Sequence, residues 1–197
     1  MKLRSLILAA AAAVAVSPFV AGPASAYEIT VPSLDYRTGP YAPNGIPFAN
    51  GIADYYTMLN ERDGGVNGVK IRIEACETAY NTKQGVECYE KTKKVGDSGA
   101  ISYQPLSTGI TYQLIPKASA DGIPVHSMGY GRTSAANGKI FEWIFNYPAT
   151  YWDGASIAIN HILDLNGGDI SGKKIALVFH NSAYGKEPIR TLEEMAE

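Results

Sequence analysis

The regular alternation of strand-like and helix-like segments is the feature that most constrains how this chain can fold. Alternating or continuous apolar patterns predict strands at residues 28–36, 69–75, 99–103, 123–127, 141–145 and 174–179. Apolar residues at helical spacing predict helices at residues 46–62, 83–94, 108–120, 151–165 and from 187 onward. Because the connections between them are short, these segments form βαβ units. We therefore expect an α/β fold with open parallel sheets covered by helices on both faces.

Several segment boundaries have local signals of their own. Pro47 fits the first turn of the helix at 46–62, and Pro188 fits the first turn of the last helix. Thr82 is a suitable cap for the helix at 83–94. The run KIALVF at 174–179 is continuously apolar, which is typical of a strand buried in a parallel sheet.

The first 26 residues have the pattern of a cleavable secretory signal peptide. Lys2 and Arg4 precede an apolar run at 6–16, which is too short to cross a bilayer, since that takes about 20 residues. The small residues at 24–26 fit a cleavage site after Ala26. We expect an exported protein that begins at Tyr27 and is not embedded in the membrane.

Charge and cysteine content limit the partners of the exported chain. The whole chain has a formal net charge of −2 and no basic patch, which argues against a nucleic-acid partner. Cys76 and Cys88 are the only cysteines, and in an oxidising compartment they most simply form a disulfide worth about 3 kcal/mol. The alternative, a metal site, lacks ligands, because the three histidines are scattered. We expect no metal and no cofactor.

Ligands of open parallel sheets bind beyond the carboxyl ends of the strands. The loops expected there are at 37–45, 104–109, 128–137 and 180–185. Ser107 and Thr108 begin a helix and could bind a carboxylate, or could serve only as caps. Residues 129–131 (Gly-Tyr-Gly) let the backbone approach a ligand closely, although an ordinary turn has the same composition.

Five phrases carry a resemblance to a known family: SLDYRTGPYAPNG, NERDGGVNGVKIRIEACETAYNTKQGVECYEK, QPLSTGITYQLIPKA, GIPVHSMGYGRTSA and KKIALVFHNSAYGKEP. With these phrases the chain resembles the solute-binding proteins of branched-chain amino acid ABC transporters, the leucine/isoleucine/valine type of the type I periplasmic binding proteins. The resemblance implies two α/β lobes, with residues 27–148 an incomplete first lobe and 149–197 the start of a truncated second lobe. The chain would be an N-terminal fragment, about half of such a protein.

The resemblance also implies roles for individual residues. It assigns the ligand carboxylate to Ser107 and Thr108, the ligand ammonium to Gly129, Tyr130 and Gly131, a contact from the second lobe to Tyr184, and the pocket wall to Tyr41 or Asn44. The Gly-Tyr-Gly sequence departs from the family pattern, so the solute could be a branched-chain amino acid or an amide, urea or an aromatic acid. The implied partner is an inner-membrane permease. With no cysteine at the cleavage site, we expect an unanchored protein of the periplasm.

Two other classes of function stay open from the residues: an exported α/β enzyme such as a hydrolase, and the sensing domain of a receptor. The string at 96–99, Gly-Asp-Ser-Gly, occurs around the nucleophile of serine proteases, but here it joins a helix to a strand. Neither a nucleophile elbow, a phosphate loop nor a dinucleotide fingerprint is present in the sequence. We therefore expect a binding protein and not an enzyme.

Overall fold

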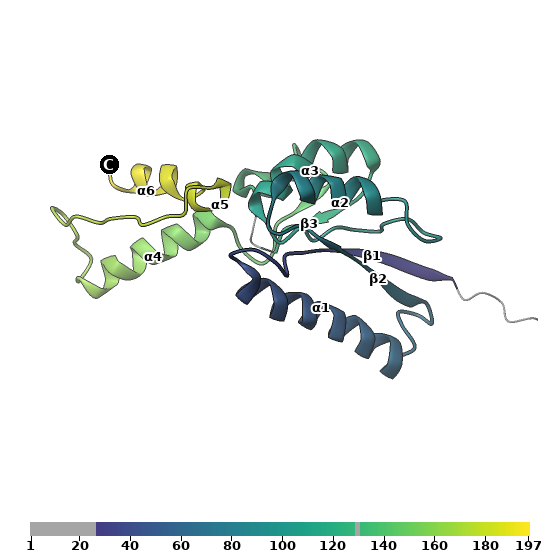
Figure 1. The fold of residues 1–197 in the computed structure, drawn as a ribbon. Helices are drawn as coiled ribbons and strands as arrows, with labels where there is room; N and C mark the ends of the chain where they lie inside the picture. Colours follow the sequence, from purple (N-terminus) through teal and green to yellow (C-terminus); the bar gives the residue numbers. More distant parts are fainter. Residues whose placement is uncertain (1–26, 129–130) are drawn as a thin grey trace, which may run out of the picture.

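The computed structural model describes residues 27–128 and 131–197, so the expected signal peptide at 1–26 lies outside the described residues. The elements alternate along the chain as the sequence predicts (Figure 1). In order they are β1 (Glu28–Asp35), α1 (Ala42–Arg62), β2 (Lys70–Glu77), α2 (Thr82–Thr92), α3 (Thr108–Asp121), β3 (Val125–His126), η1 (Thr133–Ala136), β4 (Ile144–Phe145), α4 (Tyr151–Leu165), α5 (Ala183–Lys186) and α6 (Ile189–Met195).

The first part of the chain forms one parallel sheet. β1 pairs with β2 in parallel, from Glu28 opposite Lys70 to Asp35 opposite Glu77. Single parallel bridges join β1 to residues 100–104 and join Tyr103 to Val125 of β3, and β3 pairs in parallel with β4. The spatial order is therefore β2, β1, residues 100–104, β3, β4. The predicted α/β class is confirmed, and the strands at 99–103, 123–127 and 141–145 are shorter than predicted.

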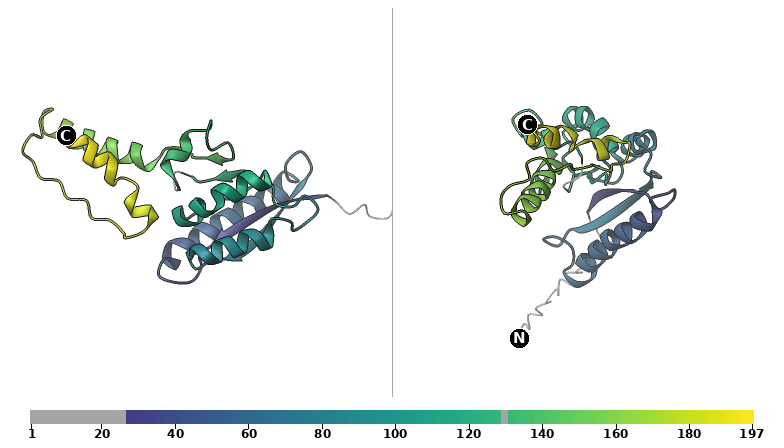
Figure 2. Two further views of the ribbon diagram at one scale, coloured as in Figure 1. Left: turned by 90° about the horizontal axis from the view of Figure 1, so that it is seen from above. Right: turned by 90° about the vertical axis from the view of Figure 1, so that its left-hand side faces the viewer.

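Helices cover both faces of this sheet, with α1 on one face and α2 and α3 on the other (Figure 1, and the right-hand view of Figure 2). The core lies under α2 and α3, where Tyr89 and Tyr103 are fully buried with their ring centroids 4.6 Å apart. Leu34, Leu114 and Val125 complete this core from β1, α3 and β3. The burial of these apolar side chains stabilises the packing of α2 and α3 on the sheet.

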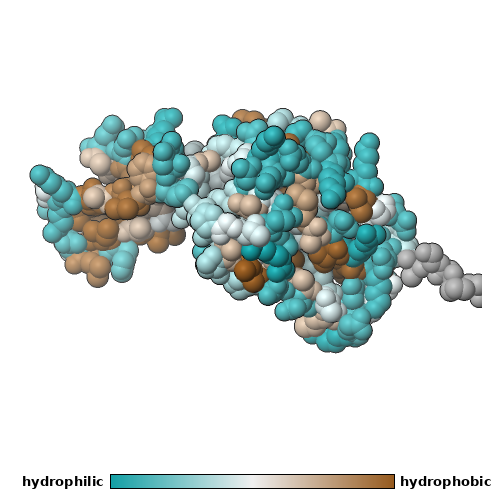
Figure 3. Space-filling model, viewed as in Figure 1, coloured by the Kyte–Doolittle hydropathy of each residue, from teal (hydrophilic) through white to brown (hydrophobic). Residues whose placement is uncertain are grey.

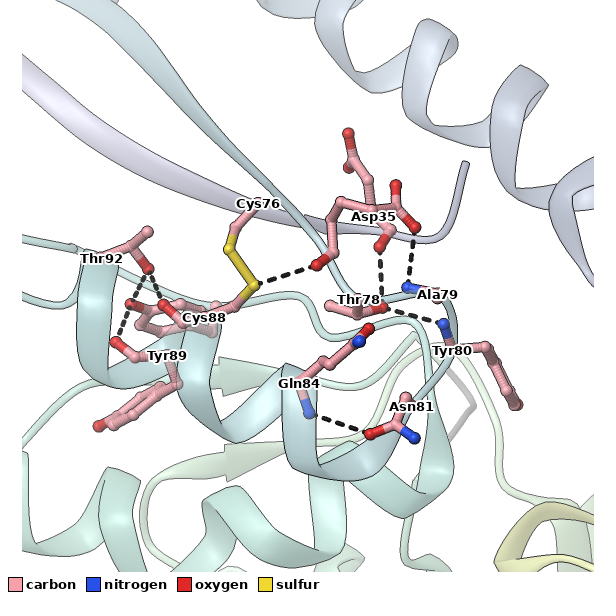
Figure 4. Close-up of a disulfide and its surroundings, with 12 residues drawn as sticks. Asp35, Cys76, Thr78, Ala79, Tyr80, Asn81, Gln84, Cys88, Tyr89 and Thr92 are labelled. Atoms are coloured by element: carbon pink, nitrogen blue, oxygen red, sulfur yellow. Dashed lines mark hydrogen bonds between the residues drawn. A yellow bond between two sulfur atoms is a disulfide. The ribbon is translucent and has the colours of Figure 1, made fainter. Parts of the chain in front are cut away.

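The disulfide between Cys76 and Cys88 is present (Figure 4). It joins Cys76, near the end of β2, to Cys88 in α2, so the helix cannot separate from its strand. The expected pairing is confirmed. The loop between these two elements, which carries Tyr80, is held at both ends as a result.

Two predicted helix starts are wrong. α1 begins at Ala42 rather than 46, because Pro43 occupies the second helical position, where no backbone N–H is needed. Pro47 thus lies inside the helix and not in its first turn. The cap of α2 is Asn81 and not Thr82, since the Asn81 amide oxygen accepts a hydrogen bond from the N–H of Gln84 at 3.1 Å.

The end of the chain differs most from its prediction. Residues 174–179 are extended but form no described strand, and Val178 is 96% exposed instead of buried. The backbone groups of a strand pair with a neighbouring strand, and among the described residues this segment has no such partner. Apolar surface consequently remains exposed over α4 and the extended segment (Figure 3). The helix predicted from 187 begins at Ile189 as α6, with Pro188 as its cap and not in its first turn, and the short helix α5 (Ala183–Lys186) precedes it.

Candidate ligand-binding cleft

The carboxyl edge of the sheet carries unusual backbone conformations. Tyr80 follows β2 with φ of 59°, Leu106 follows residues 100–104 with φ of 49°, and Met128 follows β3 with φ of 43°. Positive φ is uncommon outside glycine and costs free energy that the surrounding structure must offset. Residues with strained backbone occur often at binding sites, and these three follow strands that end at the same edge of the sheet. This edge is therefore the candidate functional site.

A cavity of about 650 Å³ opens at this edge, within the size range of small-molecule sites. Its lining residues come from the end of β1, the start of α1, the loops after β2 and residues 100–104, and the segment before α5. They are Tyr36, Tyr41, Asn44, Pro47, Phe48, Tyr80, Leu106, His180 and Tyr184. The cavity therefore lies between the first sheet and the start of the second part of the chain.

Rings in contact form one wall of the cavity. Tyr36 meets Tyr80 edge to face at 5.2 Å between centroids, and Tyr41 lies 4.6 Å from Tyr80. On its other side Tyr41 meets the ring of His180 at 5.7 Å, and its hydroxyl lies 2.5 Å from His180 Nε2. We call Tyr36, Tyr80, Tyr41 and His180 the ring wall. It crosses from the first part of the chain to the second.

Ser107 and Thr108 lie next to Leu106 at the start of α3, and both are buried. Ser107 is the cap of α3 and accepts a hydrogen bond from the N–H of Ile110 at 3.4 Å. Burial raises the pKa of Tyr80, and a side-chain hydrogen bond with Ser107 opposes that rise. The structure thus brings Ser107 to the back of the ring wall.

Thr108 links three parts of the chain. Its hydroxyl lies 2.8 Å from the hydroxyl of Tyr151 in α4 and accepts a hydrogen bond from the N–H of Gly131 at 3.2 Å. Gly131 has φ of +93°, and a Cβ there would lie 2.8 Å from Thr111 Cγ2, so the position requires glycine. The other two residues of this predicted contact, Gly129 and Tyr130, lie outside the described residues.

Glu187 joins the second part of the chain to the first. Its carboxylate accepts hydrogen bonds from the hydroxyl of Tyr112 on α3 and, at 3.1 Å, from the N–H of Thr133. Burial raises the pKa of Glu187, and the Thr133 N–H opposes the rise. The Arg132 guanidinium lies over the Tyr112 ring at 5.7 Å. The backbone carbonyl of Glu187 also accepts from Trp152 Nε1 at 3.1 Å.

The structure brings together three of the predicted site residues, Tyr41, Asn44 and Tyr184, as neighbours in one cavity. Sequence reasoning missed Tyr36, Tyr80 and His180. The sequence predicts that the second strand ends at 75, whereas β2 continues to Glu77. The loop that follows Glu77 carries Tyr80 into the cleft. A search for tyrosines in every strand-end loop would have found it.

Other chemistry receives no support from the described residues. Within residues 27–128 and 131–197 no group of three or more His, Cys, Asp or Glu side chains could hold a metal ion. The Ser98 hydroxyl accepts from the N–H of Thr30 at 3.0 Å and donates to the carbonyl of Gly99 at 2.5 Å, as a turn residue does. Of the helices in the described part of the chain, none combines the length and apolar character that a bilayer crossing requires.

A parallel α/β layer whose strand-end loops face a second segment across a cleft defines a class: the two-lobed solute-binding proteins. The chain belongs to the periplasmic binding protein family, whose model matches residues 28–197. The fold is that of the type I periplasmic binding proteins, with the second lobe incomplete.

Known proteins similar to this chain include a Leu/Ile/Val-binding protein, BraC3, of Rhizobium johnstonii, which is 25% identical over 94% of this chain and 47% of its own. A crystal structure of an ABC transporter permease from the Pseudomonas fluorescens group is 38% identical, covers 86% of this chain and 41% of its own, and has a TM-score of 0.76. A branched-chain amino acid ABC transporter protein of Thermus thermophilus, solved with bound valine, is 22% identical over 86% of this chain and 43% of its own, with a TM-score of 0.73. The chain therefore spans about half the length of these relatives.

Proposed function

We propose that this chain is part of the substrate-binding component of an ABC importer. It captures an amino acid or a similar small polar solute in the cleft and delivers it to an inner-membrane permease. The observation that carries the proposal is the cavity itself, which has Tyr41 and Asn44 on the side of the first sheet and His180 and Tyr184 on the other. The family and the relatives support the same reading.

The mechanism is a hinged clamp. Residues 27–148 form the first lobe and bind the solute first, and residues 149–197 begin the second lobe, which closes over it. Closure costs conformational freedom, so the solute must bind the closed state more tightly than the open one. Contacts between the two parts, such as Tyr41 with His180 and Tyr112 with Glu187, are the kind that closure would make.

The solute's carboxylate lies at the start of α3, where Ser107, Thr108 and free backbone N–H groups favour a negative charge. Both side chains already have partners inside the protein, which holds them in position for a ligand. Gly131, with Gly129 and Tyr130, approaches the ammonium group, and this assignment stays a prediction.

The protein acts as a receptor without catalysis and works in the periplasm after removal of residues 1–26. The relatives are transport proteins that bind solutes, and the engaged Ser98 hydroxyl supports the same conclusion. The expected signal peptide and the disulfide both suit an oxidising, exported location.

Titration calorimetry on the full-length gene product tests this function. A panel of amino acids, amides and aromatic acids should include at least one solute that binds without being converted. Replacing Ser107 and Thr108 together by alanine should weaken that binding by about 1–3 kcal/mol for each lost buried partner. Thr57→Ala, on the exposed face of α1, is the control and should leave affinity unchanged. Equal affinities for the double variant and the control would remove the carboxylate from this position.

A further inference from the structure

The lining of the cavity is mostly aromatic. Six of the nine lining residues of the cavity have aromatic rings, and Leu106 is the single aliphatic side chain besides Pro47. Lys, Arg, Asp and Glu do not occur among these nine residues. The surface offered to the solute's side group is thus aromatic, polar at its hydroxyl tips and uncharged.

The rings leave room for another ring. Their planes are inclined at 77° for Tyr36 and Tyr80, 48° for Tyr41 and Tyr80, and 82° for Tyr41 and His180. None of these pairs is stacked face to face, so the wall presents rings at several inclinations to the cavity that they line. Aromatic rings prefer such edge-to-face and offset contacts. Tyr184, 46% exposed, adds a further ring from the opposite side of the cavity.

The wall is also held in place before any solute arrives. Tyr80 lies in a loop fixed by the disulfide on one side and by the Asn81 cap of α2 on the other, and its side chain extends away from the disulfide (Figure 4). Tyr36 packs against Gly45, where a Cβ would come within 2.4 Å of its ring. A preorganised surface loses little conformational freedom when it binds, so its shape selects the solute.

We propose that the solute is an aromatic carboxylate, an aromatic amino acid or a benzoate-type acid, whose ring packs against Tyr36, Tyr80, Tyr41 and His180. This inference rests on the proposed function and names its substrate class. The solute's carboxylate lies at the start of α3. Its ring extends past Leu106, which lines the cavity and directly precedes the cap of α3, to the ring wall. Aromatic rings also bind quaternary ammonium groups, and the experiment below distinguishes such a solute from an aromatic carboxylate.

Calorimetry on the full-length gene product separates the possible solutes. Phenylalanine or benzoate should bind about two- to tenfold more tightly than leucine or valine, the range expected for one favourable ring pair. Leucine or valine binding as tightly as the aromatic solutes would overturn this inference and leave the proposed function intact, and tighter binding of glycine betaine would do the same. Absence of binding by the whole panel would refute both.

Two variants at one position locate the ring. Tyr41→Leu keeps an apolar side chain but removes a ring, and should weaken binding of the aromatic solute by about tenfold while changing leucine binding little. Tyr41→Phe keeps the ring and loses only the hydroxyl that meets His180, so it should retain most of the affinity for the aromatic solute. Equal losses in the two variants would show that the hydroxyl, and not the ring, matters, and would overturn the inference. Circular dichroism on both variants confirms that they are folded.

Discussion

Replacing Gly45 by alanine tests how tightly the ring wall is built against α1. A Cβ at this position would lie 2.0 Å from the carbonyl oxygen of Tyr36 and 2.4 Å from Cδ2 of its ring. The first of these atoms is backbone at the end of β1, so it cannot move aside as a flexible side chain would. Gly51 lies in the same helix, and a Cβ there would meet no atom within 4 Å.

The two substitutions should change the free energy of unfolding in opposite directions. Alanine is preferred over glycine inside a helix by about 1 kcal/mol, so Gly51→Ala should stabilise the protein by roughly that amount. The same gain applies at Gly45, but overpacking against Tyr36 costs about 1–3 kcal/mol, and contact with backbone places the cost at the upper end. Gly45→Ala should therefore lower the free energy of unfolding by about 2 kcal/mol.

Urea unfolding followed by circular dichroism measures both variants against the unchanged protein. The Gly45→Ala protein should unfold at lower urea and the Gly51→Ala protein at higher urea, with similar slopes. Because Tyr36 must shift to admit the methyl group, Gly45→Ala should also weaken solute binding. If Gly45→Ala stabilises the protein as much as Gly51→Ala does, the packing of Tyr36 on α1 is not as described.

Two further predictions concern covalent and ionisable links. Replacing Cys76 and Cys88 by alanine should cost about 3 kcal/mol in urea unfolding, given a sequence separation of 12, and a reducing agent should lower the stability of the unchanged protein similarly. Because burial raises the pKa of Glu187, this residue adds to the free energy of unfolding at low pH. That stabilisation is fully present below the ordinary pKa of a glutamate and is lost as the pH rises through the raised value. Unfolding measured from about pH 4 to 8 should show this difference between the unchanged protein and Glu187→Gln, because the glutamine amide has no proton to lose; parallel profiles would contradict it.

Local patterns were sufficient to predict the layered sheet. Period-two alternation predicts a strand at 69–75 whatever lies beside it, and β2 is found at Lys70–Glu77. The helix predicted at 151–165 is α4, and its start is fixed by a capping box of Thr150 and Asp153. Residues 174–179 show the limit of the same reasoning. An apolar run reports that a segment tends to be buried, but not which neighbours will bury it. Val178 remains exposed because the described residues include no strand beside it.

The cleft depended on information that spacing along the chain does not contain. The resemblance to a family predicts Tyr41, Asn44 and Tyr184 as site residues. Tyr80 could not be ranked with them, since its place in the ring wall arises from the pairing of β2 with β1. The neighbour relation between strands decides which loops share an edge, and the sequence alone did not specify it.

The two ends of the ring wall are held by different forces, and this difference favours an order of events. Tyr36 and Tyr80 are fixed by the sheet, the disulfide and the packing of α1. His180 ends an extended segment that has no sheet partner among the described residues, and it meets the wall through its contact with Tyr41. An element held by few contacts opens at low free-energy cost, whereas one held by a sheet and a disulfide does not. In the proposed clamp mechanism, a solute first meets the prepared surface at Tyr36 and Tyr80, and its own contacts with His180 and Tyr184 supply the differential affinity for closure.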